Sequence, residues 1–277
     1  MNDMKNLPVL ITGCQRSGTT LMHLILDSHP DIVSFDEFDY REDNLSTYLS
    51  ASEYGPWVAF KLPTYASGIS WIRRLSPELQ VVWCVRDPRD VVASMLALRF
   101  TLSQNSSISW CSDPMGATKE IDNCVPVLAP HTAEEIGPYL ERYRAIKSLA
   151  PLARSREDEV FVGALCWRIK NEIPSLYEKE GILYYQVRYE NLVRQPREEI
   201  SRLMASLGVQ WHDDVLRHHK LHTGIHLGGT DFSRAIDSKK VGRWRTDLNS
   251  AEVDVIQRLT SDVACKFGYE MPRHHAR

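Results

Sequence analysis

The chain has 277 residues, of which 43% are hydrophobic and 25% are charged. This length and composition lie in the ordinary range of globular proteins and are sufficient for one large hydrophobic core. The formal net charge of −3 argues against a nucleic-acid-binding protein, because counterion release needs clustered Lys and Arg. Any anionic ligand must therefore be held by a few local cations.

The N-terminal residues and the cysteines exclude other classes of protein. Residues 1–8 lead into the short apolar run Val9–Ile11 without the pattern of a signal peptide. The sequence shows no run approaching the roughly 18 apolar residues that a membrane helix needs. The six cysteines have no CxxC spacing, which disfavours a zinc or redox site, although Cys111 and Cys124 share a loop and could form a bridge. We expect a cytoplasmic protein with no membrane association and no metal.

Apolar runs and amphipathic segments alternate along the chain. Val9–Thr12 ends at Gly13, and residues 20–28 then carry apolar side chains at helical spacing. The same order recurs, with expected strands at Trp57–Lys61, Gln80–Val85 and Ile182–Val187 and expected helices at 68–75, 90–98 and 191–207. This alternation predicts an α/β fold: a single three-layer domain over residues 1–277, with a mainly parallel sheet buried on both faces.

One long stretch departs from this pattern. Residues 101–131 are rich in Ser, Asn, Asp, Pro and Gly, and helical spacing returns at 133–149 and 158–180. A long irregular stretch inside a compact domain is more often a functional lid than an accident. We therefore expect the insert at about 101–180 to act as a lid and to select the acceptor substrate.

A glycine-rich segment follows the first expected strand. Gly13-Cys-Gln-Arg-Ser-Gly-Thr-Thr20 fits the GxxxxGxT pattern of a P-loop-like nucleotide site, placed where a strand turns into a helix. Its backbone N–H groups and the helix dipole would hold a phosphate. Thr19 occupies the position at which nucleoside-triphosphate enzymes carry a lysine, which disfavours an ATPase. Taken alone, the glycines could also serve only the turn.

Four segments in a fixed order carry a family resemblance. They are Arg16–Asp31, Val85–Ser94, Arg188–Leu192 and Ser238–Arg245. In that order they resemble the 5'-phosphosulfate loop and its helix, the 3'-phosphate segment, the nucleotide-side strand and turn, and the C-terminal phosphate loop of the sulfotransferase family. The likeness is greatest to the tyrosylprotein sulfotransferase branch. The membrane anchor and disulfides of that branch have no counterpart in this sequence, which puts a peptide acceptor in doubt.

The resemblance implies a donor, 3'-phosphoadenylyl sulfate (PAPS), and a product, 3',5'-adenosine bisphosphate (PAP). It assigns two groups to the donor: a 5'-phosphosulfate set of Arg16, Ser17, Gly18, Thr19 and Thr20, and a 3'-phosphate pair of Arg86 and Ser94. Five further donor contacts carry over with a register that can slip by a residue or two: Tyr189, Ser238, Lys239, Lys240 and Arg243.

The chemistry of Arg86 agrees with this assignment. Arg86 ends an expected buried strand at the carboxyl edge, where α/β sheets bind ligands, and a guanidinium fork suits a phosphate. The alternative makes Arg86 a surface ion-pair partner of Asp87 or Asp90.

Two residues match the catalytic pair of the family. Glu37 matches the general base, although Asp36 and Asp39 are close rivals and a solvated acid is the alternative. Lys61 matches the lysine that neutralises the bridging oxygen as the S–O bond breaks, so no metal is required. A lysine that only extends from a strand tip into water is the alternative.

Other candidates receive structural interpretations. His218, His219, His222 and His226 cluster in the sequence, but solvated or loop-packing histidines are the better prediction than metal ligands. Trp167, Trp211 and Trp244 could stack on adenine or an aromatic acceptor, yet core burial is the commoner fate of tryptophan.

The resemblance therefore implies a sulfotransferase in which Glu37 takes the acceptor proton while Lys61, Arg16 and the loop N–H groups stabilise the transferring and departing groups. We expect a small hydroxyl acceptor such as an alcohol, phenol, sugar or natural product, with a tyrosine peptide as the alternative. The sequence leaves open whether the chain forms a homodimer. The rival functions are a P-loop small-molecule kinase and a non-catalytic anion-binding module.

Overall fold

The computed structural model describes residues 7–44, 47–48, 56–76, 78–226 and 228–271. The chain divides into two compact units. Unit 1 is formed by Met1–Val85 and Tyr177–Ser238, and unit 2 is formed by Arg86–Leu176 and Lys239–Arg277.

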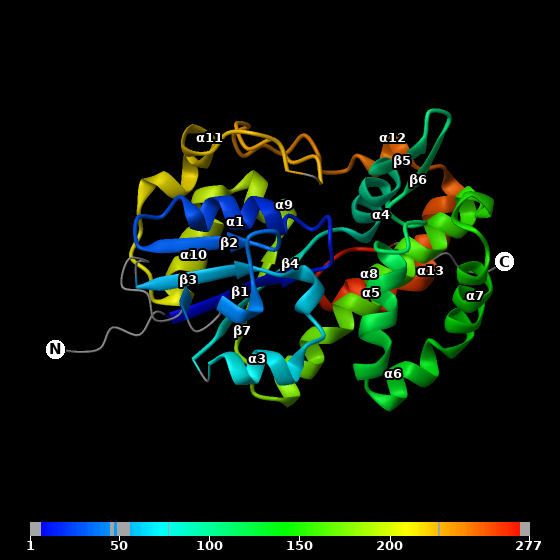
Figure 1. Cartoon of the computed structure of the whole chain (residues 1–277), viewed down its shortest axis with the longest axis horizontal. Helices are drawn as coiled ribbons and strands as arrows, with labels where there is room; N and C mark the ends of the chain where they lie inside the picture. Colours follow the sequence, from blue (N-terminus) through cyan, green and yellow to red (C-terminus); the bar gives the residue numbers. More distant parts are fainter. Residues whose placement is uncertain (1–6, 45–46, 49–55, 77, 227, 272–277) are drawn as a thin grey trace. The chain divides into compact units, whose positions relative to one another are not determined.

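Unit 1 is built on a parallel five-stranded sheet (Figure 1). Its strands are β1 (Leu7–Gly13), β2 (Ile32–Asp36), β3 (Trp57–Lys61), β4 (Gln80–Val85) and β7 (Tyr184–Arg188). They lie in the order β2-β3-β1-β4-β7, and all four pairings are parallel. The carboxyl ends of the strands therefore meet at one edge, and the predicted α/β fold with a mainly parallel sheet is confirmed.

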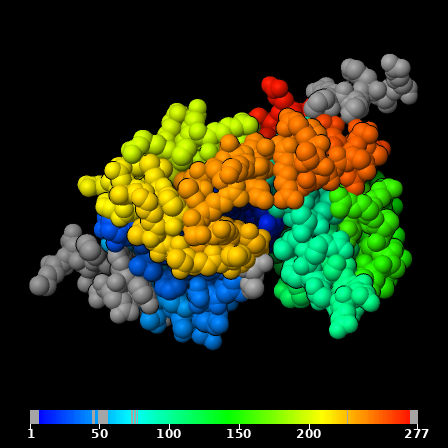
Figure 2. Space-filling model, turned by 90° about the horizontal axis from the view of Figure 1, so that it is seen from above, coloured from blue at the N-terminus to red at the C-terminus, as the bar shows by residue number. Residues whose placement is uncertain are grey.

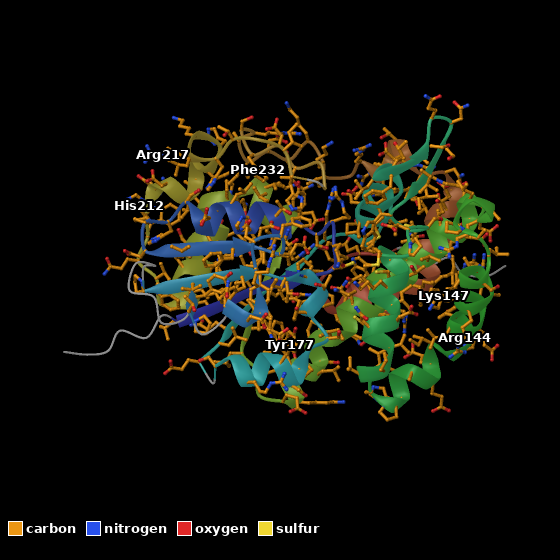
Figure 3. The ribbon with its side chains drawn as sticks, viewed as in Figure 1. Arg144, Lys147, Tyr177, His212, Arg217 and Phe232 are labelled. Atoms are coloured by element: carbon orange, nitrogen blue, oxygen red, sulfur yellow. The ribbon has the colours of Figure 1, made fainter. Side chains whose placement is uncertain are left out.

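Helices cover both faces of this sheet, as Figure 1 shows for α1 (Thr19–Asp27) and α10 (Pro196–Leu207) on one side and α3 (Ile69–Leu75) on the other. Met22 and Leu203 belong to the core cluster that packs against alternate strand residues such as Ile11. On the opposite face the ring of Trp83 meets the ring of Tyr177 at a centroid distance of 5.8 Å. Tyr177, labelled in Figure 3, donates its hydroxyl to the Ala66 carbonyl over 2.6 Å.

The segment after α10 belongs to the same unit. It contains a 3-10 helix at Asp213–Leu216 and α11 (His218–Leu221), which both contact α1. Figure 2 shows this yellow to light-orange segment lying over the blue N-terminal part of unit 1. Apart from these short helices, residues 208–226 and 228–238 have irregular backbone and carry several site residues.

The expected strands at Trp57–Lys61 and Gln80–Val85 have the predicted bounds, but two expected helices are broken. The helix expected at 191–207 is divided into α9 (Tyr189–Arg194) and α10, because Pro196 cannot continue the preceding turn. The helix expected at 133–149 is divided into α6 (Pro130–Glu135) and α7 (Gly137–Ser148), where Gly-Pro begins the second helix.

Unit 2 is mainly helical. Besides α6 and α7 it contains α4 (Pro88–Ala97), α5 (Ala117–Cys124), most of α8 (Arg156–Lys179), α12 (Trp244–Asp247) and α13 (Ser250–Lys266). Buried ion pairs join these helices: Lys170 of α8 meets Glu120 of α5 at 2.6 Å, and both side chains are buried. Removing one member of such a pair leaves an uncompensated charge, so the pair fixes how α5 meets α8.

The expectation of irregular structure over 101–131 is wrong in part. A hairpin of β5 (Arg99–Ser103) and β6 (Ser106–Ser109) occupies its start, followed later by α5. The sequence of β5 alternates polar and apolar side chains, but every one of its residues is exposed. Cys111 and Cys124 are both buried thiols and no disulfide joins them, so the bridge that their shared loop would allow does not form. Among the helices of the described ranges, none is long and apolar enough to cross a membrane.

Gly13 provides a test of the sheet. A Cβ at this position would lie 2.2 Å from the Cys84 carbonyl oxygen, and the residue has a φ of 139°. We expect Gly13→Ala to lower the free energy of unfolding by about 3 kcal/mol, because β1 and β4 must separate. Gly181→Ala is the matched control: its φ is 66° but nothing lies within 4 Å, so about 1 kcal/mol is expected. Urea unfolding curves measure both free energies of unfolding. Equal losses of stability in the two variants would contradict a steric clash between residue 13 and the Cys84 carbonyl.

Candidate functional site

The loop between β1 and α1 has an unusual backbone. Gly13, Arg16 and Gly18 all have positive φ, at 139°, 72° and 95°. Left-handed residues placed among ordinary ones can turn backbone N–H groups toward one concave side, as in an anion-binding nest. Gly18 must also lack a side chain, because a Cβ there would lie 2.7 Å from the ring of Tyr189. The structure thus places the ring of Tyr189 against the loop between β1 and α1.

The first turn of α1 is prepared for a negative charge. No side chain caps it, and it holds no acidic residue. Ser17 is 1% exposed, and its hydroxyl has no hydrogen-bond partner among the described residues. Buried polar atoms are almost always satisfied, and a helix N-terminus attracts anions. A phosphate or sulfate group in this loop would satisfy both the hydroxyl and the helix end.

A buried lysine lies at the end of the neighbouring strand. Lys61 is 1% exposed, and its Nζ lies 2.9 Å from Asp36 Oδ2 and 2.9 Å from Glu37 Oε1. The strand register produces this contact, because Asp36 is the partner of Lys61 where β2 and β3 end. The alternative of a lysine extended into water is therefore wrong.

The structure separates the three acidic rivals at residues 36, 37 and 39. Burial alone would raise the pKa of Asp36, but hydrogen bonds from His226 and Lys61 and the Lys61 charge hold it well below its usual range. Asp36 is thus a permanent, buried anion. Asp39 is exposed on the surface. Only Glu37 both meets Lys61 and keeps a partly exposed side chain, at 26%.

His226 joins this cluster, which sequence reasoning missed. Its Nε2 lies 3.3 Å from Lys61 Nζ and 3.4 Å from Asp36 Oδ2. Nothing in the sequence indicates this contact, because His226 lies in an irregular loop 165 positions from Lys61. Asp36, Glu37 and His226 are close enough to offer three metal ligands. A metal there would have to displace the ammonium of Lys61, which already lies between the two carboxylates.

Arg16 contacts the same loop. Its Nη1 donates to the Gly228 carbonyl over 2.7 Å, and the Gly228 N–H donates to His226 Nδ1 over 2.9 Å. A continuous set of contacts therefore runs within unit 1 from the phosphate loop to Lys61.

Unit 2 carries the residues predicted for the 3'-phosphate. Arg86 follows β4 directly and is 6% exposed, with its Nη2 donating to the Lys240 carbonyl. Asp90 accepts hydrogen bonds from the backbone N–H groups of Gly242 (2.7 Å) and Trp244 (3.0 Å). It thereby holds residues 239–245, the basic loop, beside α4. Arg86 lies 3.6 Å from this carboxylate.

The remaining predicted residues are distributed as follows. Ser94 lies on the partly exposed side of α4, and Lys239 and Lys240 are exposed. Arg243 forms an ion pair with Asp247. Ser238, also exposed, is the last residue of unit 1, whereas the other four belong to unit 2.

The tryptophans and the other histidines have structural contacts. Trp167 is buried, and its Nε1 donates to the Arg86 carbonyl over 3.0 Å. The guanidinium groups of Arg89 and Arg245 lie 4.3 Å and 4.6 Å from the ring centroid of Trp244. His222 meets the Ser28 hydroxyl at 3.1 Å. In the described part of the chain, the sequence cluster of four histidines does not converge on one metal site.

Comparisons with known proteins agree on one family. A family model described as "Sulfotransferase domain" matches residues 7–268. Nodulation protein NoeE of Sinorhizobium fredii is 24% identical, over 99% of this chain and 69% of that protein. Protein-tyrosine sulfotransferase 1 of Rattus norvegicus is 27% identical, over 36% of each. The sulfotransferase domain of the Synechococcus PCC 7002 olefin synthase has a TM-score of 0.59 at 17% identity, covering 98% of both chains, and so shares the fold.

Two buried histidines predict how stability depends on pH. Burial lowers the pKa of His23, which contacts the Ser34 hydroxyl at 2.7 Å, to about 4, and it lowers that of His218 to about 4 as well. Between pH 6.5 and 4 these two side chains bind more protons in the unfolded chain than in the folded one. Stability should therefore fall as the pH falls through this window, by up to about 1.4 kcal/mol per pH unit for each histidine.

His23→Asn should reduce this slope, and His131→Asn, at an exposed histidine, should leave it unchanged. Urea unfolding at several pH values measures the slopes. A slope in His23→Asn equal to that of the wild type would show that His23 is not the buried neutral group.

Proposed function

The chain belongs to the sulfotransferase domain family, and from this premise we propose that it transfers a sulfuryl group from PAPS to an acceptor hydroxyl and releases PAP. The observation that carries the proposal is the contact between the buried Lys61 and the partly exposed Glu37. In the same unit, the phosphate loop leads into helix α1, whose N-terminus has no side-chain cap. A cation, a base and an anion-binding loop are the groups that this transfer needs.

The proposed 5'-phosphosulfate ligands are Arg16, Ser17, Gly18, Thr19 and Thr20. The buried Ser17 hydroxyl without a partner and the first turn of α1 support this assignment. Tyr189 supports it as well, because its ring packs against Gly18.

The proposed 3'-phosphate ligands are Arg86 and Ser94, with Ser238, Lys239, Lys240 and Arg243 as further contacts of the donor. The link from Arg86 to Lys240 and the fastening of residues 242–244 by Asp90 support the joint assignment of α4 and the basic loop. A guanidinium and several ammonium groups suit a dianionic phosphate.

In the proposed reaction the acceptor oxygen attacks sulfur while Glu37 takes its proton. The bond from the acceptor oxygen to sulfur forms, and the bond from sulfur to the oxygen of the 5'-phosphate breaks. Lys61 and Arg16 stabilise the negative charge on the departing phosphate, which is worth most in a site where water is excluded. Asp36, whose pKa is held well below its usual range, stays ionised and pairs with the Lys61 ammonium beside the base.

We propose a small hydroxyl compound as the acceptor and assign its selection to the insert at about 101–180. A tyrosine peptide is the alternative acceptor, which the name of the rat relative, protein-tyrosine sulfotransferase 1, suggests. Thr19, where a kinase loop would carry lysine, supports PAPS over ATP as the donor.

Arg86→Ala should weaken PAP binding by about ten- to a hundredfold, because one charge-assisted phosphate contact is lost. Binding of adenosine 5'-phosphosulfate, which lacks the 3'-phosphate, should stay the same. Arg89→Ala is the matched control, since Arg89 is held by Asp87 at 2.6 Å. Calorimetric titration measures all three proteins. Tight magnesium-dependent ATP binding without preference for a 3'-phosphate would favour the kinase instead.

Glu37→Gln should lower kcat by about 10²- to 10⁴-fold, since the amide cannot take the acceptor proton. Its affinity for PAP should change little, because an amide oxygen can still accept from Lys61. Asp39→Asn, at an exposed neighbour, should keep full turnover. Transfer from radiolabelled PAPS to a panel of alcohols, phenols, sugars and tyrosine peptides measures these rates. Unchanged turnover in Glu37→Gln would move the base to another residue.

A further inference from the structure

Resting on the proposed function, we propose that His226 and Gly228 are positioning residues, which set the places of the two cations, Lys61 and Arg16, that the reaction uses. In this proposal neither residue contacts the reacting atoms. They act through contacts that start from one short loop.

The loop around these residues is held by its own backbone. The Phe232 N–H donates to the Gly224 carbonyl over 2.9 Å, and the His226 N–H donates to the Thr230 carbonyl over 2.8 Å. Ile225 and Asp231 form an antiparallel bridge between the two arms. Phe232, labelled in Figure 3, lies on this segment, and its ring is 6.4 Å from that of His226. Backbone hydrogen bonds between the two arms of the loop therefore restrain the position of His226.

The hydrogen bonds define the tautomer of His226. The Gly228 N–H donates to Nδ1 over 2.9 Å, so Nδ1 carries no hydrogen and Nε2 carries it. The Nε2–H group can then only donate. Asp36 Oδ2 at 3.4 Å is an acceptor, whereas the Lys61 ammonium at 3.3 Å is another donor. His226 thus orients Asp36 and does not compete for the protons of Lys61.

Asp36 receives both donors on the same oxygen. Lys61 Nζ lies 2.9 Å from Oδ2, and the other oxygen, Oδ1, accepts the Phe38 N–H over 3.2 Å. The carboxylate is therefore fixed at both ends, and Lys61 is directed between it and Glu37. Without His226 the carboxylate would lose one of these restraints, and the direction of the ammonium would be less well defined.

Gly228 connects this arrangement to the phosphate loop. Its N–H orients His226, and its carbonyl accepts Arg16 Nη1 over 2.7 Å. A Cβ at residue 228 would lie 2.7 Å from Arg16 Nη1 and 3.1 Å from His226 Nδ1. The φ of Gly228 lies outside the left-handed region, so alanine fits the backbone and only these two side chains must move.

Gly228→Ala tests the inference at Arg16. We expect PAP affinity to fall about tenfold, with the melting temperature close to that of the wild type. Gly137→Ala, where nothing lies within 4 Å, is the control and should bind PAP as the wild type does. Wild-type affinity in Gly228→Ala would overturn the role of Gly228.

A second set of variants tests the role of His226. His226→Phe keeps a ring but no donor and should lower kcat about tenfold or more, whereas His226→Gln, which keeps a donor for Asp36, should recover most of that loss. His222→Phe is the control, because its contact with Ser28 lies outside the cluster. Equal kcat in His226→Phe and wild type, or no recovery in His226→Gln, would overturn the positioning role.

Nitrogen NMR of the histidine side chains gives a readout without turnover. The His226 ring should show a protonated Nε2 and an unprotonated Nδ1 near neutral pH, and the opposite tautomer would overturn the inference. Failure of the proposed function looks different. Wild-type protein that binds no PAP would overturn the sulfotransferase site itself, and with it the purpose of both positioning residues.

Discussion

The buried ammonium of Lys61 is the interaction on which the site depends. A cation removed from water needs nearby negative charge, and here two carboxylates supply it at 2.9 Å each. With Lys61 and Asp36 compensating each other, the cluster keeps one further negative charge on Glu37. The arrangement therefore sets a partly exposed carboxylate beside a buried ammonium.

The parallel sheet explains how such a cluster can be assembled. β2 and β3 are adjacent and in register, so their last residues, Asp36 and Lys61, are opposite one another. β1 lies on the other side of β3 and ends in the phosphate loop. A parallel sheet brings all of these ends to one edge, which is where open α/β sheets bind their ligands. A shift of one residue in the β2–β3 pairing would turn Asp36 away from Lys61.

Much of this could be predicted from the sequence, because buried strands and a glycine-rich turn leave strong local signals. The strand Trp57–Lys61 and the loop at Gly13–Gly18 are of this kind. The preference for Glu37 over Asp36 rests on the resemblance alone, since two adjacent acids differ only in burial and partners, which the sequence does not show. The role of His226 has no signal in the sequence, because a contact across 165 positions from an irregular loop has no periodic pattern. The hairpin at Arg99–Ser109 leaves only a weak signal, because the alternation of its first strand, at Phe100 and Leu102, is short and adjoins a stretch rich in Ser and Asn.

The ring of Tyr189 occupies the space that a side chain at residue 18 would need, so the phosphate loop and the start of α9 are matched in shape. Neither position can change freely by itself. A larger residue at 18 requires a smaller one at 189, and it also meets the left-handed backbone that glycine alone tolerates well. Substitutions at these two positions, which are distant in the sequence, are therefore expected to occur together, in nature or in the laboratory.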